Sequence, residues 1–160
     1  MFLLDTNIFV TPKQTYYGFD LVPGFWISLI NAHTNLTVHS VRAVYLELQA
    51  YIDELSEWAK IIAPRSLFLE PNAQTVASIT SIVEWSRTQA FTESAQREFQ
   101  ASADLELIAT AHAMGKTVVT LETSNPESKK SIKIPDVCRA FSIKYTDPFS
   151  MLRQLGVSFT

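Results

Sequence analysis

The chain contains little cysteine and little glycine, and both shortages exclude whole classes of site. Its single cysteine, Cys138, cannot form a disulfide within the chain or build a cysteine-based zinc cluster. Its four glycines do not stand in the G-x-x-x-x-G-K-[ST] or G-x-G-x-x-G patterns that hold nucleotide phosphates. We therefore expect no disulfide framework and no glycine-loop nucleotide site, and a reducing, cytoplasmic setting fits the lone thiol.

Long apolar runs are also missing. No stretch approaches 18 consecutive apolar residues, and the apolar N-terminus contains Asp5 and lacks a basic leading segment. We therefore expect no membrane span and no secretory signal. Hydrophobic residues still make up 47% of the 160 residues, which is enough for a buried core. Because no Pro/Gly/Ser-rich linker divides the sequence, we expect residues 1–160 to form a single domain.

Charge is distributed unevenly, although the net charge is only −3. Residues 1–115 hold 6 basic and 12 acidic side chains, whereas residues 116–160 hold 7 and 4. An acidic body with a basic C-terminal third could place a metal-binding pocket beside a phosphate-binding rim. Taken alone, the asymmetry is explained more simply by chance on a solvated surface.

Short apolar segments alternate with segments of helical spacing. We predict strands at 2–4, 66–69, 117–121 and 137–145, and loops at 11–24 and 123–131. Asn35 and the short run at 36–38 are expected to end the helix that precedes them. We predict helices at 25–31, 40–51 with Ser40 as N-cap, 53–62, 73–85 with Asn72 as N-cap, 92–99, 103–114 ending at Gly115, and 148–155. This alternation predicts an α/β domain with a mainly parallel central sheet, whose functional crevice lies beyond the carboxyl ends of the strands.

Four acidic side chains are the candidate functional residues. Asp5 and Glu122 directly follow strand-like runs, Asp104 lies in the first turn of a helix, and Glu47 borders the apolar face of another helix. Carboxylates gathered at one edge repel each other unless a cation lies between them. A set without nearby His or Cys suits Mg²⁺ or Mn²⁺. Taken singly, each acid also has an ordinary explanation, as a helix-start, surface or turn residue.

The ordered set of motifs resembles PIN-domain nucleases across almost the whole chain. The segment LLDTNIF around Asp5 resembles the opening motif of that family, and Glu47 in VYLEL is similar to its helix glutamate. Asp104 in SADLELIATAHAMG resembles the third acid, and VVTLE, with Thr120 and Glu122, is similar to the VTxD position. Glu122 departs from the usual Asp, so it could act through a water instead of ligating a metal directly.

The segments YYGFDLVPGFW and IPDVCRAF are similar to a lesser-known prokaryotic PIN-like subfamily related to VapC-type toxins. The resemblance implies a PIN-like three-layer α/β/α fold and a metal-dependent endoribonuclease. It implies that catalysis and binding of Mg²⁺ or Mn²⁺ fall to Asp5, Glu47, Asp104 and Glu122, with Asp5 and Asp104 as the principal ligands. The implied partners are an RNA substrate, an antitoxin protein and a second copy of the chain in a homodimer.

Smaller roles follow from the same resemblance. Thr6, Asn7 and Thr120 would support the metal ligands or touch the substrate. Lys129, Lys130 and Lys133, in the loop after Glu122, would contact the RNA backbone without reading its sequence.

Two other function classes stay open. A PIN-like module that kept the fold and lost the chemistry would bind RNA or protein, although four intact acids speak against it. A receiver-like phosphoryl-transfer domain also uses acids at strand ends, but Asp5 has no acidic neighbour and Lys144 falls within a predicted strand instead of after it. The aromatic residues at 16–26 could stack on RNA bases; we favour instead packing of this segment onto the domain or an interface with a partner.

Overall fold

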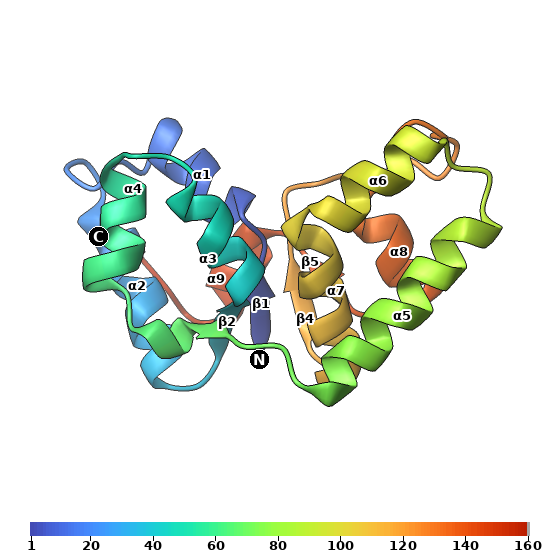
Figure 1. Ribbon diagram of the computed structural model, residues 1–160. Helices are drawn as coiled ribbons and strands as arrows, with labels where there is room; N and C mark the ends of the chain where they lie inside the picture. Colours follow the sequence, from blue (N-terminus) through green and yellow to red (C-terminus); the bar gives the residue numbers. More distant parts are fainter. Residues whose placement is uncertain (160) are drawn as a thin grey trace.

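A computed structural model describes residues 1–159 and shows five parallel strands in the order β3-β2-β1-β4-β5 (Figure 1). The strands are β1 (Phe2–Leu4), β2 (Val38–Val41), β3 (Phe68–Leu69), β4 (Thr117–Val119) and β5 (Tyr145–Thr146). Leu3 of the central strand lies opposite His39 of β2 and Val118 of β4. The chain builds the sheet outward from β1 to β3 and then places β4 on the other side of β1. The order therefore reverses between β1 and β4, where open parallel sheets place their ligands.

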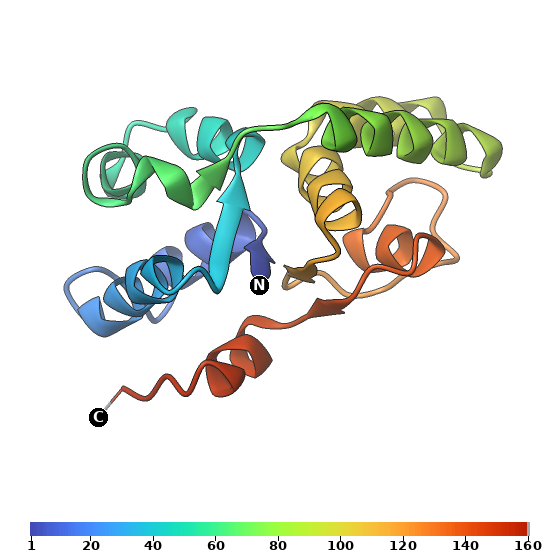
Figure 2. The same ribbon diagram turned by 90° about the horizontal axis from the view of Figure 1, so that it is seen from below.

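Helices cover both faces of this sheet. They are α1 (Asn7–Gln14), α2 (Pro23–Thr34), α3 (Arg42–Gln49), α4 (Glu54–Glu57), α5 (Ala73–Thr88), α6 (Glu93–Ala101), α7 (Ala103–Met114), α8 (Ile134–Ala140) and α9 (Pro148–Gln154). Helix α7 packs on β1, β2 and β4, and α3 and α5 pack against α7. In Figure 2, α2 and α9 lie on the opposite side of the sheet from α3, α5 and α7. The predicted three-layer α/β/α class with a parallel central sheet is confirmed.

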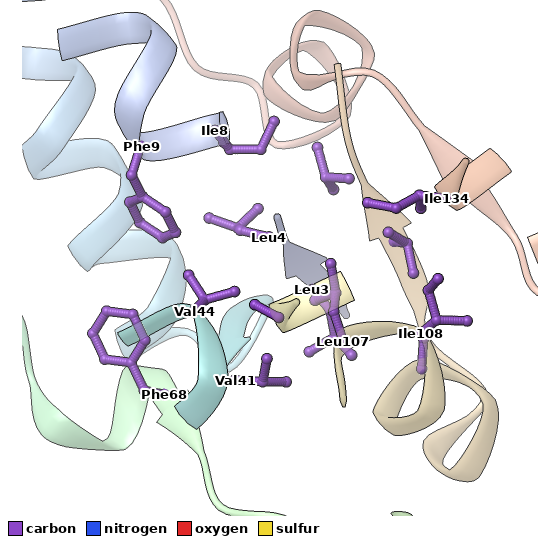
Figure 3. Close-up of a cluster of buried hydrophobic side chains, with 14 of the residues drawn as sticks. Leu3, Leu4, Ile8, Phe9, Val41, Val44, Phe68, Leu107, Ile108 and Ile134 are labelled. Carbon is purple, nitrogen blue, oxygen red and sulfur yellow. The ribbon is translucent and has the colours of Figure 1, made fainter. Parts of the chain in front are cut away.

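The hydrophobic core lies on both sides of β1 (Figure 3). Consecutive residues Leu3 and Leu4 are both fully buried, as expected of a strand covered on two faces. Helix α1 contributes Ile8 and Phe9, and the other fully buried neighbours drawn there include Val41, Val44, Leu107, Ile108 and Ile134. Complete burial of each such side chain stabilises the fold by about 1.5–3 kcal/mol. The core therefore holds the carboxyl end of β1 in place, and this end carries Asp5.

Several helix boundaries match their sequence signals. The Asn72 side chain accepts a hydrogen bond from the Thr75 amide (2.9 Å) and caps α5 as predicted. Helix α7 runs over the predicted residues and ends at Gly115, whose φ of 63° lies in the left-handed region that favours glycine. These boundaries depend on local hydrogen bonds and backbone preferences, which is why sequence signals located them.

The predicted strand at 137–145 is wrong. Residues Ile134–Ala140 form α8 instead, and only Tyr145–Thr146 pair with β4. Pro135 suits the first turn of a helix, and Ile134, Val137 and Cys138 recur at helical spacing and are fully buried. Burial of one helix face therefore outweighs the strand preference of the β-branched residues in this segment.

Other boundaries also differ from the predictions. Ser40 does not cap a helix: it lies within β2, and its hydroxyl donates to the Leu4 carbonyl (2.7 Å). The predicted loop at 11–24 is helical at both ends: α1 includes Pro12 and continues to Gln14, and α2 begins at Pro23. The predicted helix at 53–62 is divided into α4 and a π-helical segment, η1 (Trp58–Ile62).

The strands also differ from the predictions. Strand β4 ends at Val119 instead of residue 121, and β2 (Val38–Val41) was not predicted as a strand. The strand expected at 66–69 is a 3-10 turn, η2 (Arg65–Leu67), followed by β3. No helix among residues 1–159 combines the length and the apolar character that crossing a membrane requires.

Candidate functional site

Asp5 and Thr120 meet at the point where the strand order reverses. The Asp5 amide donates to the Val119 carbonyl at the end of β4 (3.0 Å), and the Thr120 hydroxyl donates to Asp5 Oδ2 (3.0 Å). Both residues are buried, with 2% and 3% of their surface exposed. Thr120 Oγ1 also accepts from the Glu122 amide (3.0 Å). Pairing of β1 with β4 therefore places the Asp5 carboxylate and the start of the Glu122 segment side by side.

Glu47 joins three elements at the same edge. One carboxylate oxygen accepts from the Thr6 hydroxyl (2.6 Å), and the other accepts from the Ala103 amide (2.9 Å). Ala103 is the first residue of α7, and Ser102, which precedes it, turns its hydroxyl to the Phe99 carbonyl. Glu47 thus satisfies a free amide at the positive end of α7. This contact places the α3 carboxylate beside Asp104, the second residue of α7.

Glu122 performs a comparable role on the other side of the site. Its Oε2 accepts from the amide of Ile134, the first residue of α8 (2.8 Å). The length of the glutamate side chain allows its carboxylate to reach this amide. The predicted roles of Glu122 did not include this contact, because the sequence signals did not locate the start of α8.

Asp104 completes an electrostatically coupled set. Burial is the main cause that raises its pKa to about 7, and the charges of Asp5, Glu122 and Glu47 add to the effect, while Lys133 opposes it. Burial likewise raises the pKa of Asp5 to about 6, with further contributions from Glu122 and Glu47 that the Thr120 hydrogen bond partly offsets. The charges of Glu47 and Glu122 therefore reach both Asp5 and Asp104, although the four acids come from four separate segments.

The four acidic side chains suit a hard divalent cation by the type of their donor atoms, but not by the distances between them. All donors are carboxylate oxygens, the type that Mg²⁺ and Mn²⁺ prefer, and their mutual repulsion is only slightly offset by Lys133. Across residues 1–159, however, no three His, Cys, Asp or Glu side chains form a ready group for a metal ion. Glu47 and Glu122 instead bind backbone amides. The residues fit the ion by donor type and charge, not as a preformed three-ligand cage.

The structure separates the three lysines predicted to hold RNA. Lys133 lines a pocket of about 130 Å³ together with Asp104 and Glu122. Lys129 and Lys130 are exposed and do not line this pocket. Only Lys133 is therefore placed to contact a phosphate held at the carboxylates, and the other two lie on the outer loop.

A larger pocket, of about 570 Å³, is also bordered by Glu47. It is lined by Thr6 and Asn7, as well as by Tyr51, which the sequence signals did not single out. Asn7 is exposed at the start of α1 and contributes to this pocket. No local sequence signal identifies Tyr51, because the pocket exists only where α1 meets the segment that joins α3 to α4.

The aromatic segment at 16–26 mostly packs inward, as we favoured. Tyr17 stacks on Phe25 with ring centroids 5.2 Å apart, and Phe19 stacks on Trp26 at 4.3 Å. The indole nitrogen of Trp26 donates to the Tyr17 carbonyl (2.8 Å). Tyr16 is the exception, with 82% of its surface exposed. These contacts fasten the segment between α1 and α2 to the domain.

Fold and site together define an α/β domain that collects acidic side chains where the order of its parallel strands reverses. The chain belongs to the family described as "Domain of unknown function (DUF4411)", whose model matches residues 2–159. Neither a curated protein nor a solved structure matches the chain.

Proposed function

We propose that this protein is a metal-dependent endoribonuclease that hydrolyses RNA phosphodiester bonds with Mg²⁺ or Mn²⁺. The observation that carries the proposal is that Asp5 and Asp104 lie at the reversal point of the sheet, where burial and the charges of Glu47 and Glu122 raise the pKa of both aspartates. Carboxyl groups whose pKa is strongly raised by burial and by neighbouring charges are typical of functional sites. The resemblance of the surrounding motifs to PIN-domain nucleases supports the same reaction.

The two aspartates would hold the ion, and the two glutamates would complete or orient its surroundings. Asp5 and Asp104 are the carboxyl groups whose pKa burial and neighbouring charge raise to about 6 and about 7, so a cation would relieve the most repulsion there. Glu47 and Glu122 already bind amides and could act through water. A bound divalent ion would polarise the scissile phosphate and promote ionisation of an attacking water.

The remaining residues position these groups and the substrate. Thr6 and Thr120 orient the carboxylates of Glu47 and Asp5 through their hydroxyl groups. Lys133 would contact the RNA backbone beside Asp104, a contact without sequence preference.

The biological setting is also a proposal. We place the enzyme in the cytoplasm as the toxin of a toxin–antitoxin pair, acting as a homodimer that an antitoxin protein neutralises. The resemblance to VapC-type toxins supports this setting, and the buried free thiol of Cys138 is compatible with a reducing compartment.

A second candidate function is a PIN-like module that binds RNA or protein without cleaving it. The observation in its favour is that Glu47 and Glu122 serve as helix caps and that residues 1–159 present no preformed three-ligand group. In this case the acids would be retained for the fold.

Cleavage assays separate the two candidates. Wild-type protein is incubated with a broad panel of single-stranded and transfer RNAs in Mn²⁺ and in EDTA, alongside Asp5→Asn and Asp104→Asn. Glu93→Gln is the matched control, because Glu93 is an exposed acid on α6. The nuclease cleaves in Mn²⁺ only and loses at least about 100-fold of its rate in either aspartate variant, but not in the control. Absence of wild-type cleavage across the panel favours the binding module.

A further inference from the structure

We propose that the pocket beside Glu47 binds one unpaired nucleobase of the RNA strand whose phosphate lies at the carboxylates. The inference deepens the proposed function and rests on it. The residues of this base pocket that carry the argument are Thr6, Asn7, Gln14, Glu47, Tyr51 and Asp53. Its volume of about 570 Å³ falls within the range of small-molecule sites in proteins, which is about 300–1,000 Å³.

The wall of the base pocket suits a flat aromatic ligand. Leu48 and Leu55 are buried beneath it and provide apolar surface. Tyr51 stands at its edge with 70% of its surface exposed. An aromatic side chain beside an apolar floor is the usual platform on which proteins stack an unpaired base.

The charges around the base pocket favour a base over a phosphate. Glu47 and Asp53 are acidic, and the ammonium of Lys13 is 3.6 Å from the Glu54 carboxylate. A phosphate entering here would be repelled, whereas a neutral base would not. The exposed amides of Asn7 and Gln14 carry both donors and acceptors, which match the hydrogen-bonding edges of a base.

The position of the base pocket also determines the path of the bound RNA strand. The pocket shares Glu47 with the acidic site, and the smaller pocket with Lys133 lies against Asp104 and Glu122. No described residue lines both pockets. A strand with one base beside Tyr51 and its phosphate at the carboxylates would therefore continue toward Lys133. Bases paired in a duplex cannot enter the pocket, so the substrate class is single-stranded RNA.

Nucleotide titration tests this proposal without any cleavage. AMP, GMP, CMP and UMP are titrated into isotope-labelled full-length protein in EDTA and followed by NMR, with ribose 5-phosphate as the baseless control. At least one nucleotide shifts the side-chain amides of Asn7 and Gln14 and the backbone amide of Tyr51, whereas ribose 5-phosphate does not. Tyr51→Ala weakens this binding about tenfold because the stacking partner is lost, and Tyr51→Phe preserves it. Tyr145→Ala, an exposed tyrosine on β5, leaves it unchanged.

Three results would overturn the base pocket. They are equal shifts with ribose 5-phosphate, unchanged nucleotide affinity in Tyr51→Ala, and no nucleotide-induced shift at these residues. The last result would also arise if the pocket received a protein partner instead of RNA. The two proposals fail separately: nucleotide binding without RNA cleavage retains the pocket and removes the nuclease, whereas RNA cleavage without nucleotide shifts retains the nuclease and removes the pocket.

Discussion

Asp5 shows how a single residue can reduce the stability of a fold. Its carboxyl group is almost completely buried, it accepts one hydrogen bond from Thr120, and it lies within reach of the charges of Glu47 and Glu122. Its pKa of about 6 means that, between about pH 4 and pH 6, the folded chain holds a proton that the unfolded chain has released, because the ordinary pKa of an aspartate is 3.8. Such a residue lowers stability at neutral pH, which is the pattern expected of a functional group.

The first prediction concerns this destabilisation. Stability contributed by protonated Asp5 is complete below about pH 4 and is lost as the pH rises through about 6. We expect Asp5→Asn to remove this loss, because the amide is neutral and can still accept the Thr120 hydrogen bond. In EDTA at pH 8 the variant should be more stable than wild type by on the order of 1–3 kcal/mol, measured by urea unfolding.

The pH dependence provides the control for this prediction. The advantage of Asp5→Asn should shrink toward zero at pH 4, where the wild-type carboxyl group is protonated. Asp147→Asn should behave in the opposite way, because hydrogen bonds from Ser150 lower the pKa of that exposed helix cap. A stability difference between Asp5→Asn and wild type that is independent of pH would contradict the argument.

His39 is the second residue whose charge the fold disfavours. Its Nδ1 is buried without a hydrogen-bond partner among the described residues, and its ring lies 4.6 Å from that of His33. Burial is the main cause that lowers its pKa, and His33, the N-terminal amine and Lys116 add to the effect. The unfolded chain therefore binds a proton at a higher pH than the folded chain does.

We expect His39 to lower the free energy of unfolding as the pH falls. Its contribution is present above the ordinary value of 6.5 and is lost as the pH falls from there through the lowered folded pKa. His39→Phe should remove that loss, so the variant should gain stability relative to wild type between pH 7 and pH 5. Parallel urea unfolding of both proteins measures this difference, and a constant difference across the range would contradict the role of His39.

At the scale of elements, the main feature is that acidic side chains from distant segments cap the N-termini of helices. Glu47 of α3 caps α7, and Glu106 of α7 accepts from the Ala43 amide in the first turn of α3 (3.0 Å), so the two helices cap each other. Glu122 caps α8 in a similar way. These contacts join segments that are distant in sequence, and they place each acidic side chain at the carboxyl edge of the sheet.

Two substitutions of Glu122 separate the effect of its helix-capping hydrogen bond from the effect of its negative charge. Glu122→Asp keeps the negative charge but is one methylene too short for the present contact, so the Ile134 amide should lose its partner. We expect a loss of about 0.5–2 kcal/mol on thermal or urea unfolding, as for other helix caps. Glu122→Gln keeps the acceptor and should remain near wild-type stability. Equal destabilisation by both substitutions would mean that the charge, not the reach, matters at this position.

At the scale of the molecule, the acidic site should couple metal binding to folding. An ion that binds only the folded state stabilises it, by about 2.7 kcal/mol when its concentration is 100 times the dissociation constant. For a chain of this length, each kcal/mol corresponds to about 2–4 °C in melting temperature. We therefore expect Mn²⁺ to raise the melting temperature of wild-type protein by several degrees.

Asp104→Asn should change the melting temperature differently in the absence and in the presence of Mn²⁺. Without metal it should melt above wild type, because burial and neighbouring carboxylates raise the pKa of Asp104 to about 7. With Mn²⁺ its gain should be much smaller, since a proposed ligand is missing. Calorimetry with and without Mn²⁺, with Glu93→Gln as the control, tests both statements. An equal gain in all three proteins would show that Mn²⁺ acts outside the acidic site.

Local signals in the sequence predicted the α/β class and several helix limits. The buried run at 2–4, the Asn72 cap and the Gly115 stop each depend on neighbours a few residues away. The sequence also predicts that Asp5, Glu47, Asp104 and Glu122 gather at one edge, because strand ends and helix starts meet there in a parallel sheet. Helix α8 was missed because burial of its apolar face, which depends on distant residues, decides its conformation.

The sequence by itself determined which residues carry the charge and which segments are apolar enough to be buried. Only the tertiary structure decided which partner each acid has: Thr120 for Asp5, Thr6 and Ala103 for Glu47, and Ile134 for Glu122. It also formed the pocket beside Tyr51, which needs α1 to lie next to the end of α3. The physical reason is the range of the forces: backbone preferences act between near neighbours, whereas burial, charge repulsion and pocket shape depend on residues that only folding brings together.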